Sequence, residues 1–492
     1  YILPSIYHSD LDRGFSVIDY DLEEAFHSEK ALLRLGRQNI DLKLDFVLNH
    51  ASVQSPQFQD LLENGSRSEY RDFFINWNTF WENCGEMTED GYIQPEQKYL
   101  DPMFFRKPGL PLLMVEMADG SRIPYWNTFY QEIRDTDDYH TRYLGQMDLN
   151  IKSEKVWDFY RETIKKLAGY GAKIIRLDAF AYAPKAPGRA NFLNEPETWE
   201  FLEQIHKLAK PYGIRLLPEI HAGYKEKKYK MIAEKGYLTY DFFLPGLILD
   251  ALYRGDGSYL EQWAKEQIKE NIHTVNMLGC HDGIPVLDLA GLLPDDRIED
   301  LIRLLVDRGG FVKDLHGNKK MYYQVNTTYY NALGEDEQAL LLARALQIFM
   351  PGKPQVWYLD LFAGSNDYEA VKRAGAGGHK EINRTNLSQK DIESGLEKEV
   401  VKKQLEMLKF RKEFPAFGFD AEMEIRTKPA AQISAQAENA LHFAELPADQ
   451  MYNRIYITWK KDGYLARLSA DLKAHTYRIQ ALDPSGNLVW QS

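Results

Sequence analysis

The sequence predicts an α/β protein, a (β/α)8 TIM barrel with a small domain inserted after strand 3 and an antiparallel β-domain at the C-terminal end. Short apolar runs that end in polar residues alternate with stretches of helical periodicity, as in a barrel of parallel strands. Residues 51–145 are rich in aromatics and too long for one crossover, which predicts the inserted domain. Residues 417–492 alternate apolar and polar side chains between turns, which predicts the antiparallel sheet.

One apolar run, Ala172–Tyr182, carries Arg176 and Asp178 at its carboxyl end. In a (β/α)8 barrel, catalytic groups lie at the carboxyl ends of the strands. Arg176 and Asp178 are two residues apart, so both point to the same side of the strand, where the guanidinium can keep the carboxylate ionised and oriented. Such an Asp is suited to act as a nucleophile. The alternative is a structural Arg–Asp pair at a strand end.

Three further apolar runs end in polar side chains: Leu42–His50 ends in Asn49 and His50, Leu216–His221 carries Glu219, and Thr274–Gly283 carries His281 and Asp282. Because the carboxyl ends of barrel strands share one face, we expect Asp178, Glu219 and Asp282 to converge. The neighbours of Glu219 in residues 216–220 are apolar, which should raise the pKa of its carboxyl and keep it protonated. A protonated carboxyl suits a general acid.

Stretches with helical spacing lie between these runs, at residues 28–37, 152–168, 196–210, 335–349 and 398–414. In 152–168, apolar residues recur three and four positions apart, so this helix should pack on the outside of the barrel. Gly352–Tyr358 is expected to form the last helix–strand unit together with 335–349. Asp241 begins another element and is expected to cap it or to pair structurally.

These four runs, in this order and spacing, resemble the signature regions of the α-amylase superfamily, glycoside hydrolase family 13. Further motifs resemble those of its sucrose phosphorylase branch: Gly14–Tyr20, Gln146–Asn150, Tyr323–Tyr330 and Glu381–Arg384. The resemblance covers nearly the whole chain. It implies a retaining phosphorylase, a hexosyltransferase that needs inorganic phosphate as co-substrate and no cofactor.

The resemblance also implies the roles of the three acids. Asp178 would attack the anomeric carbon to form a β-glucosyl-enzyme, and Glu219 would protonate the leaving sugar. Asp282 would hold glucose hydroxyls whose bonds strengthen in the transition state. Phosphate would then attack to give α-glucose 1-phosphate. Such double displacement requires the carboxyls of Asp178 and Glu219 to lie about 5 Å apart, and about 9 Å would refute it.

The substrate-binding residues implied by the resemblance are Asp12, His50, Phe129, Gln146, Arg176, Tyr182, His221, His281, Tyr323, Gln324 and Arg384. Asp12 and Arg384 would bind glucose hydroxyls, and His50 would donate to the 6-hydroxyl. Each residue also has a structural interpretation. Asp12 can simply form a turn, His50 can be a satisfied buried histidine, and most aromatics of the inserted domain make its core.

Positive charge near the acceptor side distinguishes this chain from typical sucrose phosphorylases. The residues concerned are Arg106, Lys107, His316, Lys319 and Lys320. They suggest a phosphorylated leaving group, so sucrose 6'-phosphate is favoured over sucrose, with fructose 6-phosphate as product. A glucosylglycerol or glucosylglycerate phosphorylase, an α-glucosidase or transglucosidase of the same superfamily, and a catalytically dead sugar-binding subunit remain open.

Composition narrows the class of protein further. The chain has 492 residues, a net charge of −13 and two cysteines, and its basic cluster at residues 225–230 is short. This argues against nucleic acid as a partner and against a disulfide framework. The chain contains no run of about 18 apolar residues, so no membrane span is expected. We expect a cytoplasmic monomer or homodimer whose partners are a small sugar and phosphate, with no metal site.

The expected domains are a catalytic barrel at 1–50 and 146–415, an inserted domain B at 51–145, and a C-terminal β-domain at 416–492. Loop insertions are expected around 285–330 and 360–398. Tyr1-Ile-Leu-Pro resembles the end of a barrel strand, and the family's first strand has no counterpart after it. We therefore expect the first barrel strand to be missing from this chain and to precede Tyr1 in the complete protein.

Overall fold

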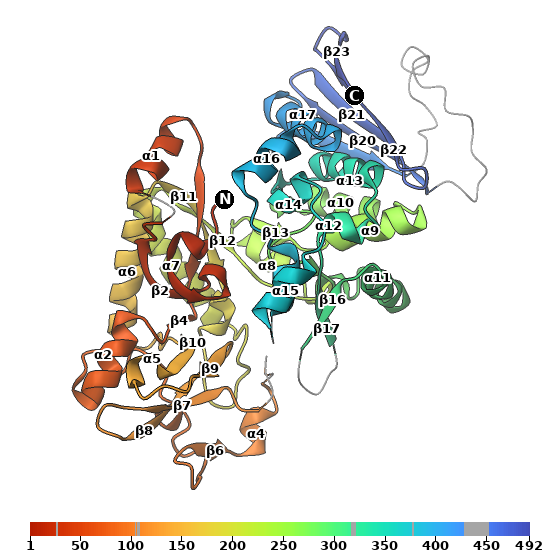
Figure 1. Cartoon of the computed structure of the whole chain (residues 1–492). Helices are drawn as coiled ribbons and strands as arrows, with labels where there is room; N and C mark the ends of the chain where they lie inside the picture. Colours follow the sequence, from red (N-terminus) through yellow and green to blue (C-terminus); the bar gives the residue numbers. More distant parts are fainter. Residues whose placement is uncertain (26–27, 104, 106–108, 316–320, 376–377, 428–451) are drawn as a thin grey trace. The chain divides into compact units, whose positions relative to one another are not determined.

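The computed structural model describes residues 1–25, 28–103, 105, 109–315, 321–375, 378–427 and 452–492. The chain divides into two compact units, Tyr1–Ile220 and His221–Asp314 with Met321–Ser492. The elements of each unit are labelled in Figure 1, and each unit is described by itself.

A parallel three-stranded sheet organises the first unit. Strands β3 (Leu42–Val47), β11 (Ala172–Asp178) and β12 (Arg215–Pro218) lie in the order β12-β11-β3. All six residues of β3 are buried, as expected for a strand with both faces covered. Because the strands are parallel, their carboxyl ends lie at one edge of the sheet. That edge carries Asp178 and, directly after β12, Glu219.

The helices predicted for this unit are confirmed to within two residues. They are α1 (Glu29–Arg37), α6 (Glu154–Gly169) and α7 (Glu197–Ala209). The Ser28 hydroxyl accepts from the Ala31 amide and caps α1. In α6 the buried positions include Val156, Tyr160 and Ile164, and the Tyr160 hydroxyl donates to the Leu48 carbonyl at 2.6 Å. The apolar face of α6 therefore packs close to the end of β3.

Short elements make up the rest of the first unit. The helices are α2 (Pro56–Asn64), α3 (Trp77–Phe80), α4 (Gln97–Leu100) and α5 (Tyr139–Arg142). The strand pairs are β1 (Tyr7–Leu11) with β2 (Ser16–Leu22), β5 (Gly85–Met87) with β6 (Ile93–Pro95), and β7 (Leu112–Glu116) with β8 (Arg122–Trp126). Strands β4 (His50–Ser52), β10 (Tyr143–Asp148) and β9 (Gln131–Ile133) form an antiparallel sheet. A separate core around Trp77, Trp81 and Trp126 stabilises residues 75–126.

A second parallel sheet lies in the second unit, where strands β13 (Thr239–Asp241), β14 (Thr274–Asn276) and β18 (Lys353–Pro354) follow the order β13-β14-β18. The helices of this part are α8 (Lys228–Glu234), α9 (Leu244–Arg254), α10 (Ser258–Lys269), α12 (Tyr329–Ala332) and α13 (Glu337–Phe349). The carboxylate of Asp241 accepts from the Leu244 amide and the Trp263 indole, so it pairs structurally, one of the two expected roles. Helix α13 is buried from Ala339 to Phe349.

The regions in which loop insertions were expected contain regular structure. Around 285–330 lie helix α11 (Asp295–Asp307) and the sheet of β15 (Ile284–Pro285), β17 (Met321–Asn326) and β16 (Phe311–Leu315), in the order β15-β17-β16. Around 360–398 lie α14 (Tyr358–Leu361), α15 (Tyr368–Ala374), the 3-10 segment η8 (Gly378–Asn383) and α16 (Gln389–Leu396). Helix α11 forms because Leu301, Ile302 and Leu305 give it a buried stripe.

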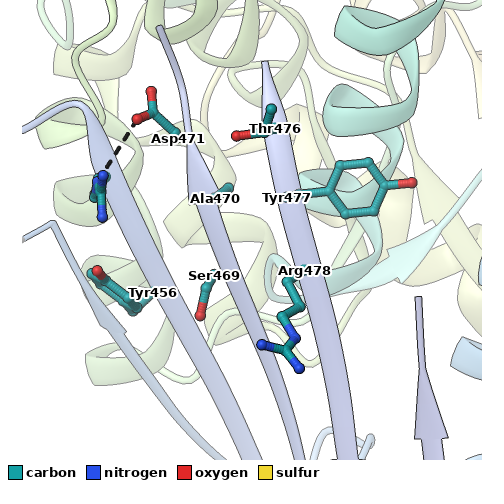
Figure 2. Close-up of a pocket in the computed structure, with 8 residues that line it drawn as sticks. Tyr456, Ser469, Ala470, Asp471, Thr476, Tyr477 and Arg478 are labelled. Carbon is teal, nitrogen blue, oxygen red and sulfur yellow. Dashed lines mark ion pairs between the residues drawn. The ribbon is translucent and has the colours of Figure 1, made fainter. Parts of the chain in front are cut away.

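The C-terminal part confirms the predicted antiparallel sheet. After α17 (Glu399–Glu413), the sheet has the order β19 (Glu422–Arg426), β20 (Arg454–Lys461), β21 (Tyr464–Asp471), β22 (Thr476–Leu482) and β23 (Leu488–Gln491). Its inner face packs on α13, where the Trp459 indole donates to the Phe349 carbonyl at 2.8 Å. Its outer face has a cavity of about 220 Å³ lined by Tyr456, Ser469 and Arg478, among others (Figure 2).

No helix in the described part of the chain combines the length and the apolar character needed to cross a membrane.

Candidate active site

Arg176 joins the ends of the three parallel strands of the first unit. Its Nη1 lies 2.6 Å from Asp45 Oδ1 and 2.9 Å from Asp178 Oδ1, and its Nη2 lies 2.6 Å from Glu219 Oε1. The Arg176 side chain is 3% exposed, whereas those of Asp178 and Glu219 are 14% and 13% exposed. One buried guanidinium therefore holds two partly accessible carboxylates close together. The predicted pairing of Arg176 with Asp178 is present.

Charge compensation keeps this guanidinium ionised. Burial by itself lowers the pKa of Arg176, but the carboxylates of Glu219, Asp45 and Asp178 outweigh it and raise the pKa well above its usual value. The permanent positive charge of Arg176 beside Asp178 orients that carboxylate and favours its ionised form. The chain leaves the sheet directly after Asp178, where Ala179 has φ 52°, a left-handed conformation that is uncommon for a residue with a Cβ atom.

Sequence reasoning missed two features of this cluster. It described the surroundings of Glu219 as apolar, whereas the structure places Arg176 against its carboxylate. It also overlooked Asp45, which is in register with Arg176 on the neighbouring strand. A charged residue in the middle of a fully buried strand was the available signal, since a buried carboxylate needs a partner.

His50 packs between backbone and aromatic groups. Its ring is buried, its Nε2 lies 3.1 Å from the Phe15 carbonyl oxygen, and its centroid is 4.8 Å from that of Phe129. Phe129 in turn meets the Tyr182 ring edge-on at 5.4 Å. Burial lowers the pKa of His50 to about 4, so the imidazole is neutral near pH 7. With its single N–H directed at Phe15, His50 could donate to a sugar hydroxyl only by giving up that bond.

The segments that carry His50, Phe129 and Tyr182 are joined by a buried ion pair between Lys185 and Asp148. Lys185 Nζ lies 2.8 Å from Asp148 Oδ2, and it also donates to Asn49 Oδ1 at 2.8 Å and to the Tyr182 carbonyl. Asp148 accepts from the amide and the hydroxyl of Thr128. The pair thus connects the segments that carry His50, Phe129 and Tyr182. Burial lowers the pKa of Lys185, and the Asp148 carboxylate opposes that shift.

The other predicted residues of the first unit are Asp12 and Gln146. Asp12 is exposed in the 3-10 turn η2 (Asp12–Gly14), where its φ of 48° is left-handed, and it contributes to the electrostatic environment of His50. Gln146 is buried in β10, and its Oε1 accepts from the Tyr130 amide at 3.4 Å.

Asp282 of the second unit is surrounded by positive groups. Its Oδ1 lies 2.5 Å from Lys380 Nζ and 3.6 Å from Arg384 Nη2, and its Oδ2 lies 3.1 Å from His281 Nε2. Burial alone raises the pKa of the Asp282 carboxyl, but His281, Lys380 and Arg384 together hold it well below its usual value. Asp282 is therefore ionised at neutral pH. Lys380 was not among the predicted residues, although it directly precedes the Glu381–Arg384 motif.

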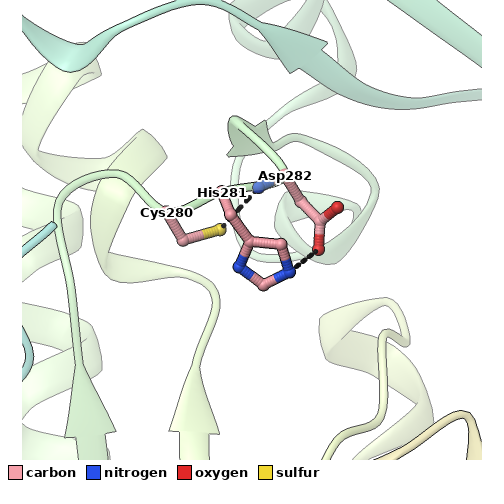
Figure 3. A group of neighbouring side chains, drawn as sticks. All are labelled: Cys280, His281 and Asp282. Carbon is pink, nitrogen blue, oxygen red and sulfur yellow. Dashed lines mark hydrogen bonds and ion pairs between the residues drawn. The ribbon is translucent and has the colours of Figure 1, made fainter. Parts of the chain in front are cut away.

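Among the described residues, one group could hold a metal ion: Cys280, His281 and Asp282, whose ligand atoms lie within 4.8 Å of one another (Figure 3). These side chains already have partners within the turn. His281 Nε2 contacts the Asp282 carboxylate, and the Asp282 amide donates to Cys280 Sγ at 3.4 Å. A thiol and an imidazole are poor ligands for calcium or magnesium, which prefer oxygen.

The remaining predicted residues of the second unit differ in their surroundings. His221 Nδ1 lies 3.1 Å from Asp288 Oδ2, and its ring stacks on Phe242 at 3.9 Å. Gln324 is buried in β17, and within the described residues its Nε2 has no hydrogen-bond partner. Tyr323 also lies in β17. The predicted acceptor residues Arg106, Lys107, His316, Lys319 and Lys320 lie outside the described residues.

Comparison with known proteins gives consistent matches. The family model for the α-amylase catalytic domain matches residues 1–282. The chain is 52% identical to a sucrose 6(F)-phosphate phosphorylase of Ilumatobacter coccineus, with 96% of this chain and 91% of that protein covered. It is 36% identical to a protein of the same name from Thermoanaerobacterium thermosaccharolyticum, with 99% and 91% covered.

The structural comparison agrees. The crystal structure of sucrose 6F-phosphate phosphorylase from Thermoanaerobacter thermosaccharolyticum superposes with a TM-score of 0.84 at 35% sequence identity, covering 100% of this chain and 90% of that one. The predicted fold class, a TIM barrel with a C-terminal antiparallel β-domain, is thereby confirmed. The chain belongs to the α-amylase family and, within it, to the sucrose phosphorylase branch of hexosyltransferases.

Proposed function

We propose that this chain is a retaining α-glucoside phosphorylase that converts sucrose 6'-phosphate and inorganic phosphate into α-D-glucose 1-phosphate and fructose 6-phosphate. The observation that carries the proposal is the guanidinium of Arg176, which holds Asp178 and Glu219 together at one sheet edge. Retaining enzymes need two carboxyl groups close to each other, one as nucleophile and one as acid. The names of the similar proteins support the substrate.

In the first step, Asp178 attacks the anomeric carbon while the bond to the fructosyl oxygen breaks. Glu219 gives its proton to that oxygen, so the fructose moiety leaves as a neutral alcohol. Arg176 keeps Asp178 ionised and oriented before the attack. The product is a glucosyl ester of Asp178 with inverted configuration.

In the second step, inorganic phosphate attacks the same carbon from the face that fructose vacated. Glu219, now ionised, accepts a proton from phosphate, and the ester bond to Asp178 breaks. Two inversions restore the α-configuration. Neither step requires a cofactor.

Asp282 would bind hydroxyl groups of the glucosyl unit through bonds that strengthen as positive charge develops in the transition state. Its surrounding cations keep it ionised for that role. Arg384 and His281, which contact its carboxylate, would bind sugar hydroxyls or position Asp282. We assign these residues to sugar binding and not to a metal.

The test of the reaction is the release of glucose 1-phosphate from sucrose 6'-phosphate with and without inorganic phosphate. The proposal predicts phosphate-dependent release and its loss in Asp178→Asn. Glucose released without phosphate would indicate a hydrolase. No reaction with any α-glucoside would indicate a sugar-binding protein.

The test of the acceptor is the comparison of kcat/KM for sucrose 6'-phosphate with that for sucrose. Arg106, Lys107 and the basic residues at 316–320 should favour the phosphorylated substrate through charge-assisted hydrogen bonds. Arg106→Ala should reduce kcat/KM for sucrose 6'-phosphate and leave that for sucrose nearly unchanged. Equal values for both substrates in the unmodified protein would refute the phosphate clamp.

A cytoplasmic location and a monomeric or homodimeric state also belong to this proposal. The acidic composition and the two cysteines of the chain support the cytoplasmic location.

A further inference from the structure

The turn that carries His281 and Asp282 is fixed at every residue by a side chain from elsewhere in the second unit. The bonds are Gly279 N to Asp360 Oδ2 at 2.8 Å, Asn383 Nδ2 to the Cys280 carbonyl at 2.7 Å, Arg384 Nε to the His281 carbonyl at 2.8 Å, and Asn326 Nδ2 to the Asp282 carbonyl at 2.7 Å. The backbone of the turn is thus held by α14, by β17 and by residues 383–384.

The segment 378–384 reaches both the backbone and the carboxylate of this turn. Asn383 and Arg384 bond to its carbonyls, while Lys380 contacts the Asp282 side chain. At 2.5 Å, Lys380 lies closer to Oδ1 than Arg384 does at 3.6 Å. The backbone bonds leave the side chain of Asp282 free to rotate, so its orientation depends on the contacts to its two oxygens.

We propose that Lys380 is a positioning residue that aligns the carboxylate of Asp282 for sugar binding, with His281 holding the other oxygen. This inference rests on the proposed function, in which Asp282 binds glucose hydroxyls. Contacts to both oxygens fix the orientation of a carboxylate, whereas a carboxylate with a contact to one oxygen can still rotate. Both oxygens keep further lone pairs that can accept from sugar hydroxyls.

The charges around Asp282 agree with this role. The groups that contact its carboxylate are His281, Lys380 and Arg384. One further acid is near them, since Glu381 Oε1 lies 3.9 Å from Arg384 Nη1. The Lys380 side chain is 24% exposed, so solvent weakens its contribution without removing it. Loss of Lys380 would remove one of three positive groups that lower the pKa of Asp282.

The experiment compares Lys380→Met, Lys380→Arg and the matched control Lys372→Met, an exposed lysine of α15. We expect Lys380→Met to raise KM for the glucosyl donor about tenfold, because the Asp282 carboxylate loses its shortest ionic contact and with it its alignment. The acidic limb of kcat/KM should shift to higher pH. Lys380→Arg should restore most of both values, and Lys372→Met should resemble the unmodified protein.

Unchanged KM and an unchanged acidic limb in Lys380→Met would overturn the inference. A purely structural role for Lys380 would lower the melting temperature without moving the acidic limb, and that result would also overturn it. If Lys380→Met does not fold, Lys380→Gln, which keeps a polar donor without the charge, replaces it and is judged by the same two readouts.

Failure of the inference can be told apart from failure of the proposed function. Phosphate-dependent release of glucose 1-phosphate by the unmodified protein tests the function alone. If the unmodified protein shows that activity, the variants at Lys380 decide the inference. If it does not, the dissociation constant of glucose for the unmodified and variant proteins measures the same alignment of Asp282, and equal constants would overturn it.

Discussion

At the scale of single residues, Arg176 connects the carboxylates of the candidate active site in the first unit. It is almost completely buried, yet it contacts three carboxylates, two within strands β3 and β11 and one directly after β12. Removal of one partner from a buried ionic cluster leaves an uncompensated charge. The loss of folding stability is then larger than the net stability that the intact cluster contributes. The same residue therefore influences both folding stability and the orientation of Asp178.

We expect Arg176→Met to lower the free energy of unfolding by about 3–5 kcal/mol, because three carboxylates lose their shared cation. Phosphorolysis should fall by about a hundredfold or more, since Asp178 loses its orientation. Urea unfolding and initial rates measure both effects. The control is Arg189→Met, which removes an exposed pair with Glu197 at 3.4 Å and should cost at most about 1 kcal/mol. A similar cost for both variants would contradict the role of Arg176.

His50 gives a prediction about pH. In the folded protein the pKa of His50 is about 4, below its usual value of 6.5. Between pH 4 and pH 6.5 the imidazole is therefore protonated in the unfolded chain and neutral in the folded protein. The free energy of unfolding should therefore fall as the pH decreases from about 6.5 to 4, by up to about 3 kcal/mol. His50→Gln should reduce this dependence. An imidazole resonance of His50 that titrates near pH 6.5 would contradict the burial argument.

At the scale of elements, the buried pair of Lys185 and Asp148 connects segments that are far apart in sequence. Lys185→Met should destabilise the protein by about 3–5 kcal/mol, because Asp148 would be left as an unpaired buried charge. KM for the glucosyl donor should also rise, since His50, Phe129 and Tyr182 lose their common anchor. Addition of Asp148→Asn should recover part of the stability. Exposed Lys152→Met is the control, and a loss of the same size there would contradict the argument.

Strands and helices were predictable from the sequence, whereas the contacts between them were not. Apolar runs placed Asp178 and Glu219 at or just beyond strand ends, and helical spacing predicted α6 and α7 closely. The run that carries Asp282 was expected to be a strand up to that residue, but β14 ends at Asn276 and Asp282 lies in the turn that follows. Asp45, Lys185 and Lys380 were missed because each acts on a residue more than 30 positions away in the chain. For Lys185 and Lys380, nothing in the local sequence distinguishes such a partner from a surface charge, whereas the position of Asp45 within an apolar run was a signal.

At the scale of the whole molecule, the residues proposed for catalysis are divided between the two units. The first carries Asp178 and Glu219 on a parallel sheet, and the second carries Asp282 on a turn fixed by α14, β17 and residues 383–384. Similarity over 96% of the chain to a sucrose 6(F)-phosphate phosphorylase accounts for the order of these elements. The separate roles of Asp178 as nucleophile, Glu219 as general acid and Asp282 in sugar binding remain to be tested by experiment.

The most direct test is mass spectrometry of a trapped intermediate. Glu219→Gln, incubated with α-glucosyl fluoride, should still form the ester because fluoride leaves without an acid, while its second step is slowed. Double displacement at Asp178 predicts one glucosyl residue attached to the peptide that contains Asp178. A glucosyl residue on another peptide, or turnover without any covalent adduct, would contradict the double displacement at Asp178.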